Sequence, residues 1–142
     1  MEQSFCSSMI AKLKVAFPYY FKDMSKEEIY EMIRTYKDSL NYNPIIIESA
    51  IKEIIKTSKF MPSIGEIIEA CENVCTHQKL DVIEKMKKDN YFKSDWEVEK
   101  IYRFIEKGLI PDWLLDDMKR YGFVEERMIT NNETKYLEVN NV

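Results

Sequence analysis

The chain has 142 residues, of which 45% are hydrophobic, 32% charged and 13% aromatic. This length suits one compact domain with at most a small appendage, and the composition is too apolar for a disordered chain and too charged for a membrane protein. The formal net charge of -4 argues against a protein that mainly coats nucleic acid, because phosphate binding requires a surplus of lysine and arginine.

The first segment carries no basic leader, and Lys12 and Lys14 interrupt its apolar residues. We therefore expect neither a signal peptide nor a membrane span, and we expect a cytoplasmic location. The three cysteines are an odd number without a secretory signal, so they are expected to be reduced thiols.

Only three glycines and four prolines interrupt a chain rich in Glu, Lys, Ile, Leu and Met, which predicts an all-α fold. A first helix should end near Phe17, because Pro18 prevents its continuation. The capping-box pair Ser25 and Glu28 begins a second helix. Asn43-Pro44 begins a third helix, whose expected core stripe is Ile47, Ala50, Ile51, Ile54 and Ile55.

The start of a fourth helix lies in the stretch TSKFMPSIGEIIEA, residues 57–70. Pro62 restricts the turn, Ser63 can cap the helix, and Glu66 completes a second capping box. No helix breaker appears before the sequence KKDN at residues 87–90, so this helix is expected to be long. Residues 1–90 are therefore predicted to form a small bundle of four helices.

A helical hairpin is predicted at residues 91–122. Ser94 and Glu97 form a third capping pair, and Gly108 should end the helix that they begin. Pro111 opens the second helix of the hairpin, and Gly122 is placed to end it in the left-handed conformation.

The C-terminal tail, residues 123–142, has a different character. Its β-branched and aromatic residues flank Asn131-Asn132, a pair suited to a two-residue hairpin turn. We expect either a short β-hairpin or a flexible, strand-like tail.

The sequence lacks the glycine patterns of nucleotide-binding proteins. Its only glycines, Gly65, Gly108 and Gly122, cannot form a phosphate-binding loop or a dinucleotide fingerprint. The sole histidine, His77, lies on a charged helix, and adjacent carboxylates diverge by about 100° on a helix. We therefore expect no enzymatic activity and no cofactor.

Cys71, Cys75 and His77 suggest a metal site, because residues four apart share a helix face and thiolates favour zinc. His77 lies well round the helix from Cys75, so we expect the two cysteines to be small core residues and no metal to be bound.

Aromatic and methionine side chains are the best candidates for partner contacts. We expect the two tryptophans, Trp96 and Trp113, to fill the hairpin core in preference to an interface, and we expect the reverse for the apolar tail residues. The residues kept as partner-binding candidates are Trp113, Phe123, Met128, Ile129, Tyr136 and Leu137.

Four features in chain order resemble the phage replicative-helicase loader and inhibitor family, over residues 5–75. They are the aromatic-proline step Phe17-Pro18, the pattern I-x-x-x-I-x-x-Y at residues 29–36, A-I-x-x-x-I at residues 50–55, and T-S-K-F-x-P-S-I-x-E-I at residues 57–67. Met61 stands where family members often have a second proline. The block residues assigned to the scaffold of the N-terminal domain are Ser58, Lys59, Phe60, Pro62, Ser63, Ile64, Glu66 and Ile67.

This resemblance implies a non-enzymatic phage or prophage protein in the cytoplasm of a bacterial host cell. It would bind the hexameric replicative DNA helicase, hold it inactive and help deliver it to an origin marked by an initiator protein, which is a further potential partner. The family grips the helicase with its C-terminal region, here the hairpin and the tail. We expect a monomer, with weak or absent direct DNA binding and no membrane association.

The main alternative is a small helical nucleic-acid-binding replication or regulatory module. Its only support is a cluster of basic and aromatic residues that acidic residues dilute. The cluster comprises Lys79, Lys85, Lys87, Lys88, Tyr91 and Phe92.

Overall fold

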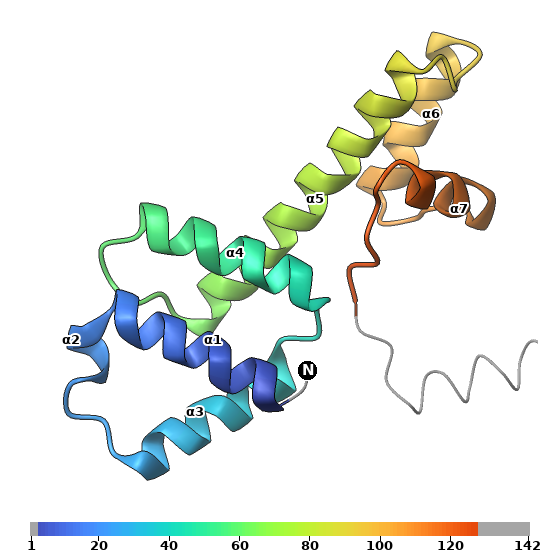
Figure 1. The fold of residues 1–142 in the computed structure, drawn as a ribbon. Helices are drawn as coiled ribbons and strands as arrows, with labels where there is room; N and C mark the ends of the chain where they lie inside the picture. The colour runs from blue at the N-terminus through green and yellow to red at the C-terminus, as the bar shows by residue number, and fades with distance from the viewer. Residues whose placement is uncertain (1–2, 128–142) are drawn as a thin grey trace, which may run out of the picture. The chain divides into compact units, whose positions relative to one another are not determined.

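The computed structural model describes residues 3–127, which contain seven helices and no strand (Figure 1). The all-α class is therefore confirmed. The chain forms two compact units. Unit 1 comprises Met1–Cys71 and Glu125–Val142, and unit 2 comprises Glu72–Val124.

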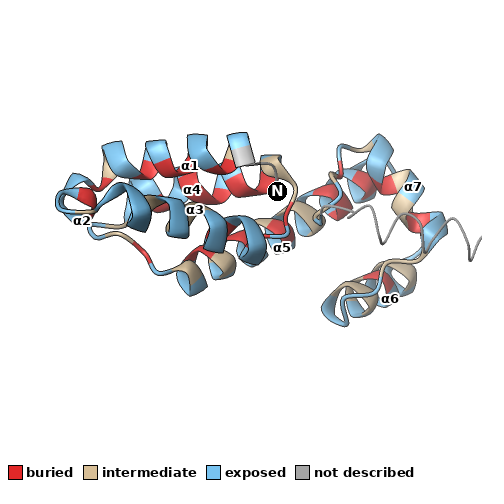
Figure 2. Ribbon diagram, turned by 90° about the horizontal axis from the view of Figure 1, so that it is seen from below, coloured by how far each residue is buried: buried red, intermediate tan, exposed pale blue. Residues whose placement is uncertain are grey.

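Unit 1 contains α1 (Gln3–Ala16), α2 (Pro18–Phe21), α3 (Lys26–Ser39), α4 (Pro44–Thr57) and the first turns of α5 (Ile64–Lys88). Helix α1 packs against α2, α3 and α4. Its buried residues recur at the spacing of one helical face, and those of α4 face the same core (Figure 2). The buried residues of α1 are Cys6, Met9, Ile10 and Leu13.

The predicted helix starts are confirmed by their hydrogen bonds. Ser25 Oγ accepts a bond from the Glu28 amide at 3.2 Å, and the Glu28 carboxylate accepts from the Ser25 amide at 3.4 Å. Ser63 and Glu66 form the same reciprocal pair at the start of α5, with equal distances. The Asn43 side chain accepts from the Ile45 amide at 3.0 Å. These bonds satisfy amide groups that the first turn of a helix leaves without partners.

Two local features differ from the expectation. Pro18 ends α1 but also occupies the first position of α2, a four-residue helix that the sequence did not suggest. In α4 the buried stripe includes Ile46, which is 2% exposed, whereas Ile55 is 40% exposed. The stripe is therefore rotated relative to the prediction, and Ile55 lies at the surface.

Unit 2 contains the remainder of α5 together with α6 (Asp95–Glu106) and α7 (Asp112–Arg120). Gly108 and Gly122 follow the two hairpin helices, as expected, with φ of 72° and 99°. The left-handed conformation was predicted for Gly122, and Gly108 adopts it as well. The boundary between the units falls at Cys71, within α5, whereas the sequence suggested residue 90. The second half of α5 joins unit 2 because it supplies Val82, Ile83 and Met86 to the hairpin core.

After α7 the chain returns to unit 1. Tyr42 and Arg127 form an isolated antiparallel bridge, and the Asn43 amide donates to the Glu126 carbonyl at 2.8 Å. The Arg127 guanidinium lies over the Tyr42 ring, 4.3 Å from its centroid. Residues 125–127 are thus fixed beside the start of α4. The β-hairpin predicted around Asn131-Asn132 lies outside the described residues.

Candidate functional site

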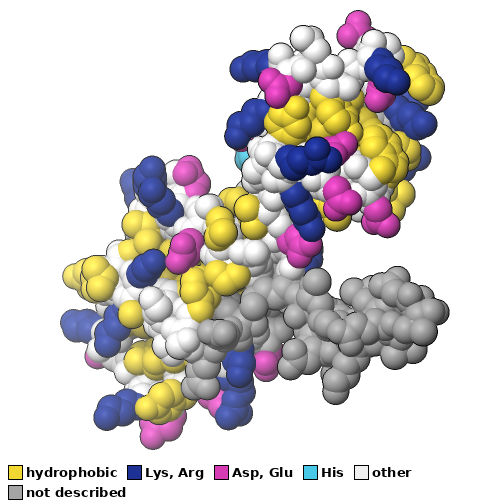
Figure 3. All heavy atoms as spheres, turned by 45° about the vertical axis from the view of Figure 1, so that its right-hand side comes forward, with side chains coloured by type: hydrophobic (Ala, Val, Ile, Leu, Met, Phe, Trp, Pro, Cys, Tyr) yellow, Lys and Arg dark blue, Asp and Glu magenta, His cyan; other side chains and the backbone are white. Residues whose placement is uncertain are grey.

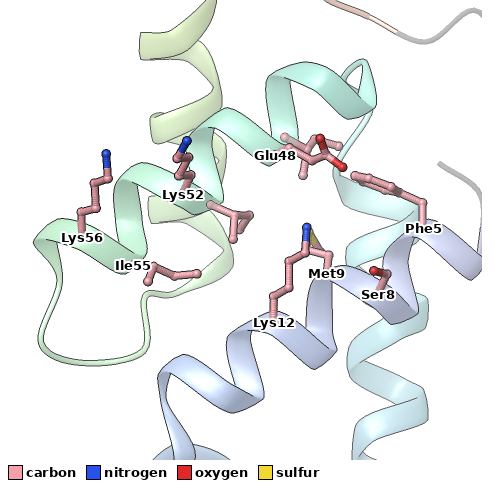
Figure 4. Close-up of a pocket in the computed structure, with 10 residues that line it drawn as sticks. Phe5, Ser8, Met9, Lys12, Glu48, Lys52, Ile55 and Lys56 are labelled. Atoms are coloured by element: carbon pink, nitrogen blue, oxygen red, sulfur yellow. The ribbon is translucent and has the colours of Figure 1, made fainter.

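A groove of about 400 Å³ lies between α1 and α4 of unit 1 (Figure 4). Its floor is formed by Met9, Ile47 and Ile51, which are at most 3% exposed. The half-buried Phe5 and the exposed Ile55 line its edges. Phe5 and Ile55 are therefore the apolar side chains of the groove that a partner can reach most readily.

The rim of this groove is mainly basic. Lys12 projects from α1, and Lys52 and Lys56 project from α4, one helical turn apart. Glu48 is the only acidic side chain among the lining residues. The local charge is therefore positive, although the chain as a whole carries a net charge of -4.

The helical repeat explains why these side chains gather. Phe5, Met9 and Lys12 follow one another at spacings of four and three along α1, so they share one side of the helix. The α4 contribution repeats this spacing with Glu48, Ile51, Lys52, Ile55 and Lys56. Packing α1 against α4 brings the two stripes together.

A second exposed surface, the aromatic corner, is lined by residues on either side of Pro18 and by the loop between α4 and α5. Tyr19 and Phe60 are 90% and 83% exposed, and both line a pocket of about 500 Å³ together with Lys59. Exposed aromatic rings of this kind are frequent in binding surfaces.

The aromatic corner changes the interpretation of the residue 57–67 block. Ser63 and Glu66 cap α5 and Ile67 is fully buried, so these residues support the fold. Lys59 and Phe60 are exposed, and their assignment to the scaffold is therefore corrected. They follow the end of α4, in a loop that keeps their side chains outside the core.

The tryptophans of unit 2 are not core residues. Trp96 is 67% exposed and Trp113 is 54% exposed, contrary to the expectation that they fill the hairpin core. Ile101, Leu114 and Met118 are buried there instead. Figure 3 shows that hydrophobic side chains lie on the molecular surface among charged groups. Trp96 and Trp113 are two of the large exposed hydrophobic side chains.

The remaining partner-binding candidates separate into two groups. Phe123 was expected to contact a partner, but its side chain is 7% exposed and packs in the core of unit 2. It is therefore not available for partner binding. Met128, Ile129, Tyr136 and Leu137 lie outside the described residues.

The basic and aromatic cluster at residues 79–92 does not present stacked rings to solvent. Tyr91 and Phe92 are half-buried against the core of unit 2 and contact each other edge to face. Tyr91 donates a hydrogen bond to the Asp117 carboxylate, and Lys87 pairs with Glu84 at 3.4 Å. These contacts are structural, and they leave fewer groups for a nucleic-acid backbone.

Two tyrosines of unit 2, Tyr91 and Tyr102, donate hydrogen bonds to carboxylates. Burial and the bond to Asp117 raise the pKa of Tyr91 to about 12. Tyr102 donates to Glu84 at 3.0 Å, and burial together with this bond raises the pKa of Tyr102. The same bond, with Lys87, lowers the pKa of Glu84. The pKa values shift in these directions because burial and the hydrogen bonds favour the neutral phenol, and the hydrogen bond also favours the ionised carboxylate.

The cysteines and the histidine do not come together as a ligand set. Cys6, Cys71 and Cys75 are buried without disulfides in the part of the chain that the structure describes, whereas His77 is exposed. Cys6 donates to the Ile33 carbonyl at 3.3 Å, and burial raises the pKa of its thiol. Residues 3–127 contain no group of three His, Cys, Asp or Glu side chains placed to hold a metal ion.

No protein-family model matches this chain, and no curated protein or solved structure shows detectable similarity to it. Of the helices formed by residues 3–127, none has the length and apolar character needed to cross a membrane.

The groove is the main feature that sequence reasoning missed. A weak signal for it exists, because Lys52 and Lys56 stand four residues apart beside Ile51 and Ile55. The facing stripe of α1, which is Phe5, Met9 and Lys12, meets these α4 residues only through tertiary packing.

Proposed function

We propose that this protein is a DNA-replication accessory protein of a phage or prophage that binds the hexameric replicative DNA helicase. It holds the helicase inactive and helps to load it at an origin. The observation that carries the proposal is the S-K-F-x-P-S-I-x-E-I block at residues 58–67, which resembles the helicase loader and inhibitor family.

The placement of this block supports the proposal. Its second half begins α5 and buries Ile67, so the block joins α4 to α5 within a helical N-terminal unit. Its first half exposes Lys59 and Phe60, which are available for contact. We further propose that α1, α3, α4 and the start of α5 form the four-helix scaffold expected for this domain.

The activity proposed for this protein is binding and release, without catalysis of its own. We place the helicase contacts on the exposed Trp113 and on the apolar residues that follow Arg127, namely Met128, Ile129, Tyr136 and Leu137. An origin-binding initiator is proposed as a second partner, and the protein is proposed to act as a cytoplasmic monomer.

The experiment is capture of partners by the tagged full-length protein, followed by mass spectrometry and by assays of helicase ATPase and unwinding. We expect the phage or host replicative helicase in the eluate and a decrease in its unwinding rate. Recovery of DNA without helicase, with binding that falls steeply as salt rises, would favour the nucleic-acid-binding alternative.

The tail assignment is tested with a truncation that retains every described residue. Removal of residues 128–142 leaves Phe123, a core residue of unit 2, and Arg127, which bridges to Tyr42, in the chain, and circular dichroism checks that the truncated protein is folded. We expect this truncation and Trp113→Ala each to reduce helicase capture by about tenfold or more, a typical hot-spot loss. Trp96→Ala is the matched control, and full binding by the truncated protein would reject the tail assignment.

A further inference from the structure

We propose that the groove between α1 and α4 is a docking site for an acidic amphipathic helix of a partner protein. This inference rests on the groove alone and is independent of whether the replicative helicase is the principal partner.

The shape and lining of the groove suit a helix. A helix that binds in a groove inserts apolar side chains spaced by three, four and seven residues, and it needs an apolar floor along its length. Met9, Ile47 and Ile51 form such a floor between the two helices, and Phe5 and Ile55 add apolar surface at its edges. The thioether of Met9 adapts its shape to different apolar side chains.

The charges of the rim select the partner. The ammonium groups of Lys12, Lys52 and Lys56 form no ion pair with any residue of the described segment 3–127. They stand on both sides of the apolar floor, so carboxylates flanking the apolar face of a bound helix can reach them. A basic helix would meet these three lysines without compensation, except near Glu48.

Other occupants fit these charges less well. Nucleic acid would extend beyond the three rim lysines over a chain whose net charge is -4, whereas a short acidic helix can keep its carboxylates at the rim. A mainly apolar ligand would use the floor but leave the three lysines without partners. An amphipathic helix with acidic flanks uses both features of the groove.

The test uses two synthetic, fluorescently labelled helical peptides. Both carry leucines at positions i, i+3, i+4 and i+7, and their remaining positions are mainly Glu in one peptide and mainly Lys in the other. Binding to the full-length protein is measured by fluorescence anisotropy at low and at physiological salt. We expect the Glu peptide to bind at least about tenfold more tightly than the Lys peptide, because three rim charges contribute together.

Variants localise the binding to the groove. The triple variant Lys12→Glu/Lys52→Glu/Lys56→Glu should reverse the preference between the peptides. The control variant Lys14→Glu/Lys22→Glu/Lys26→Glu makes the same change in net charge outside the groove lining and should retain the preference. Ile55→Glu should weaken binding of the Glu peptide by about tenfold. Circular dichroism confirms that each variant is folded before binding is compared.

Several results would overturn the proposal. These are equal binding of the two peptides, no binding of the Glu peptide, or an unchanged preference in the rim triple variant. A dimer in light scattering that Ile55→Glu converts to a monomer would assign the groove to a second copy of the chain. Tighter binding by a peptide of residues 128–142 than by the Glu peptide would assign the groove to the C-terminus of this chain.

Discussion

The two units bury apolar surface in different ways. Unit 1 encloses mainly aliphatic side chains together with the rings of Phe17, Phe21, Tyr36 and Tyr42, and α1 and α4 contribute four and five buried residues to it. Unit 2 has a smaller core, surrounded by half-buried aromatic rings whose hydroxyl groups bind carboxylates. The stability of unit 1 should therefore depend mainly on packing, and that of unit 2 also on polar contacts at its edge.

The largest expected effect tests the packing of unit 1. Ile47→Ala removes a fully buried side chain of α4 and should lower the free energy of unfolding by about 2–5 kcal/mol. Ile45→Ala is the control, because Ile45 is 56% exposed on the same helix and its truncation should cost under about 1 kcal/mol. Chemical denaturation measures both, and equal losses would contradict the assigned faces of α4.

The same truncation in unit 2 sharpens the comparison. Leu114→Ala also removes a fully buried side chain, but from a core with fewer buried residues. We expect a loss near the lower end of about 2–5 kcal/mol, because a small core collapses more readily around a cavity. A loss clearly larger than that of Ile47→Ala would show that unit 2 is the more tightly packed unit.

Alkaline pH tests tyrosine burial in unit 1. Burial raises the pKa of Tyr36 from 10.0 to about 12. Between these values the unfolded chain loses the phenolic proton and the folded chain keeps it, so the free energy of unfolding should fall as pH rises. Ionisation of Tyr36 should account for roughly 2–3 kcal/mol of this fall in the free energy of unfolding. Urea titrations at pH 9 and 11.5 should show a smaller decline for Tyr36→Phe, and an unchanged decline would contradict the assignment.

A cap substitution should have a smaller effect. Ser63→Ala removes the acceptor for the Glu66 amide at the start of α5 and should cost about 1 kcal/mol. Ser49→Ala is the matched control, because Ser49 is exposed within α4 and alanine favours a helix interior. In thermal melts, Ser63→Ala should have a lower unfolding midpoint than Ser49→Ala.

The smallest effect concerns the edge of unit 2. Tyr102→Phe removes the hydrogen bond that lowers the pKa of Glu84. A lowered carboxyl pKa stabilises the fold above the normal pKa of 4.5, and this contribution is lost as pH falls below that value. The variant should therefore lose less stability than the parent chain between pH 5 and pH 3. An identical acid profile would show that the bond contributes nothing.

Features encoded within a few residues could be predicted from the sequence. The capping pairs at Ser25, Ser63 and Ser94 were recognised because both partners lie three residues apart. Gly108 and Gly122 could be placed at the helix ends because glycine itself is the local signal, and Gly122 has the left-handed conformation predicted for it. Such signals need no knowledge of the rest of the fold.

Features that depend on which elements pack together could not be predicted. Ile46 and Ile55 are both apolar and both fit the edge of a helical stripe, so only the position of α1 decides which is buried. The exposure of Trp96 and Trp113 likewise depends on how α6 and α7 present their faces. The groove requires two helices at once, so the sequence of α4 shows the pair Lys52 and Lys56 but not the α1 stripe that faces them.

The pairing of Tyr42 with Arg127 has a consequence for the order of folding. Most of the structure consists of helices whose contacts are close in sequence and form quickly, whereas this pairing closes a loop that includes α4 to α7. We expect it to form after the helices. Because each doubling of a flexible loop adds only about 0.6 kcal/mol to the cost of closure, the turns of unit 2 should tolerate inserted residues with little change in this pairing.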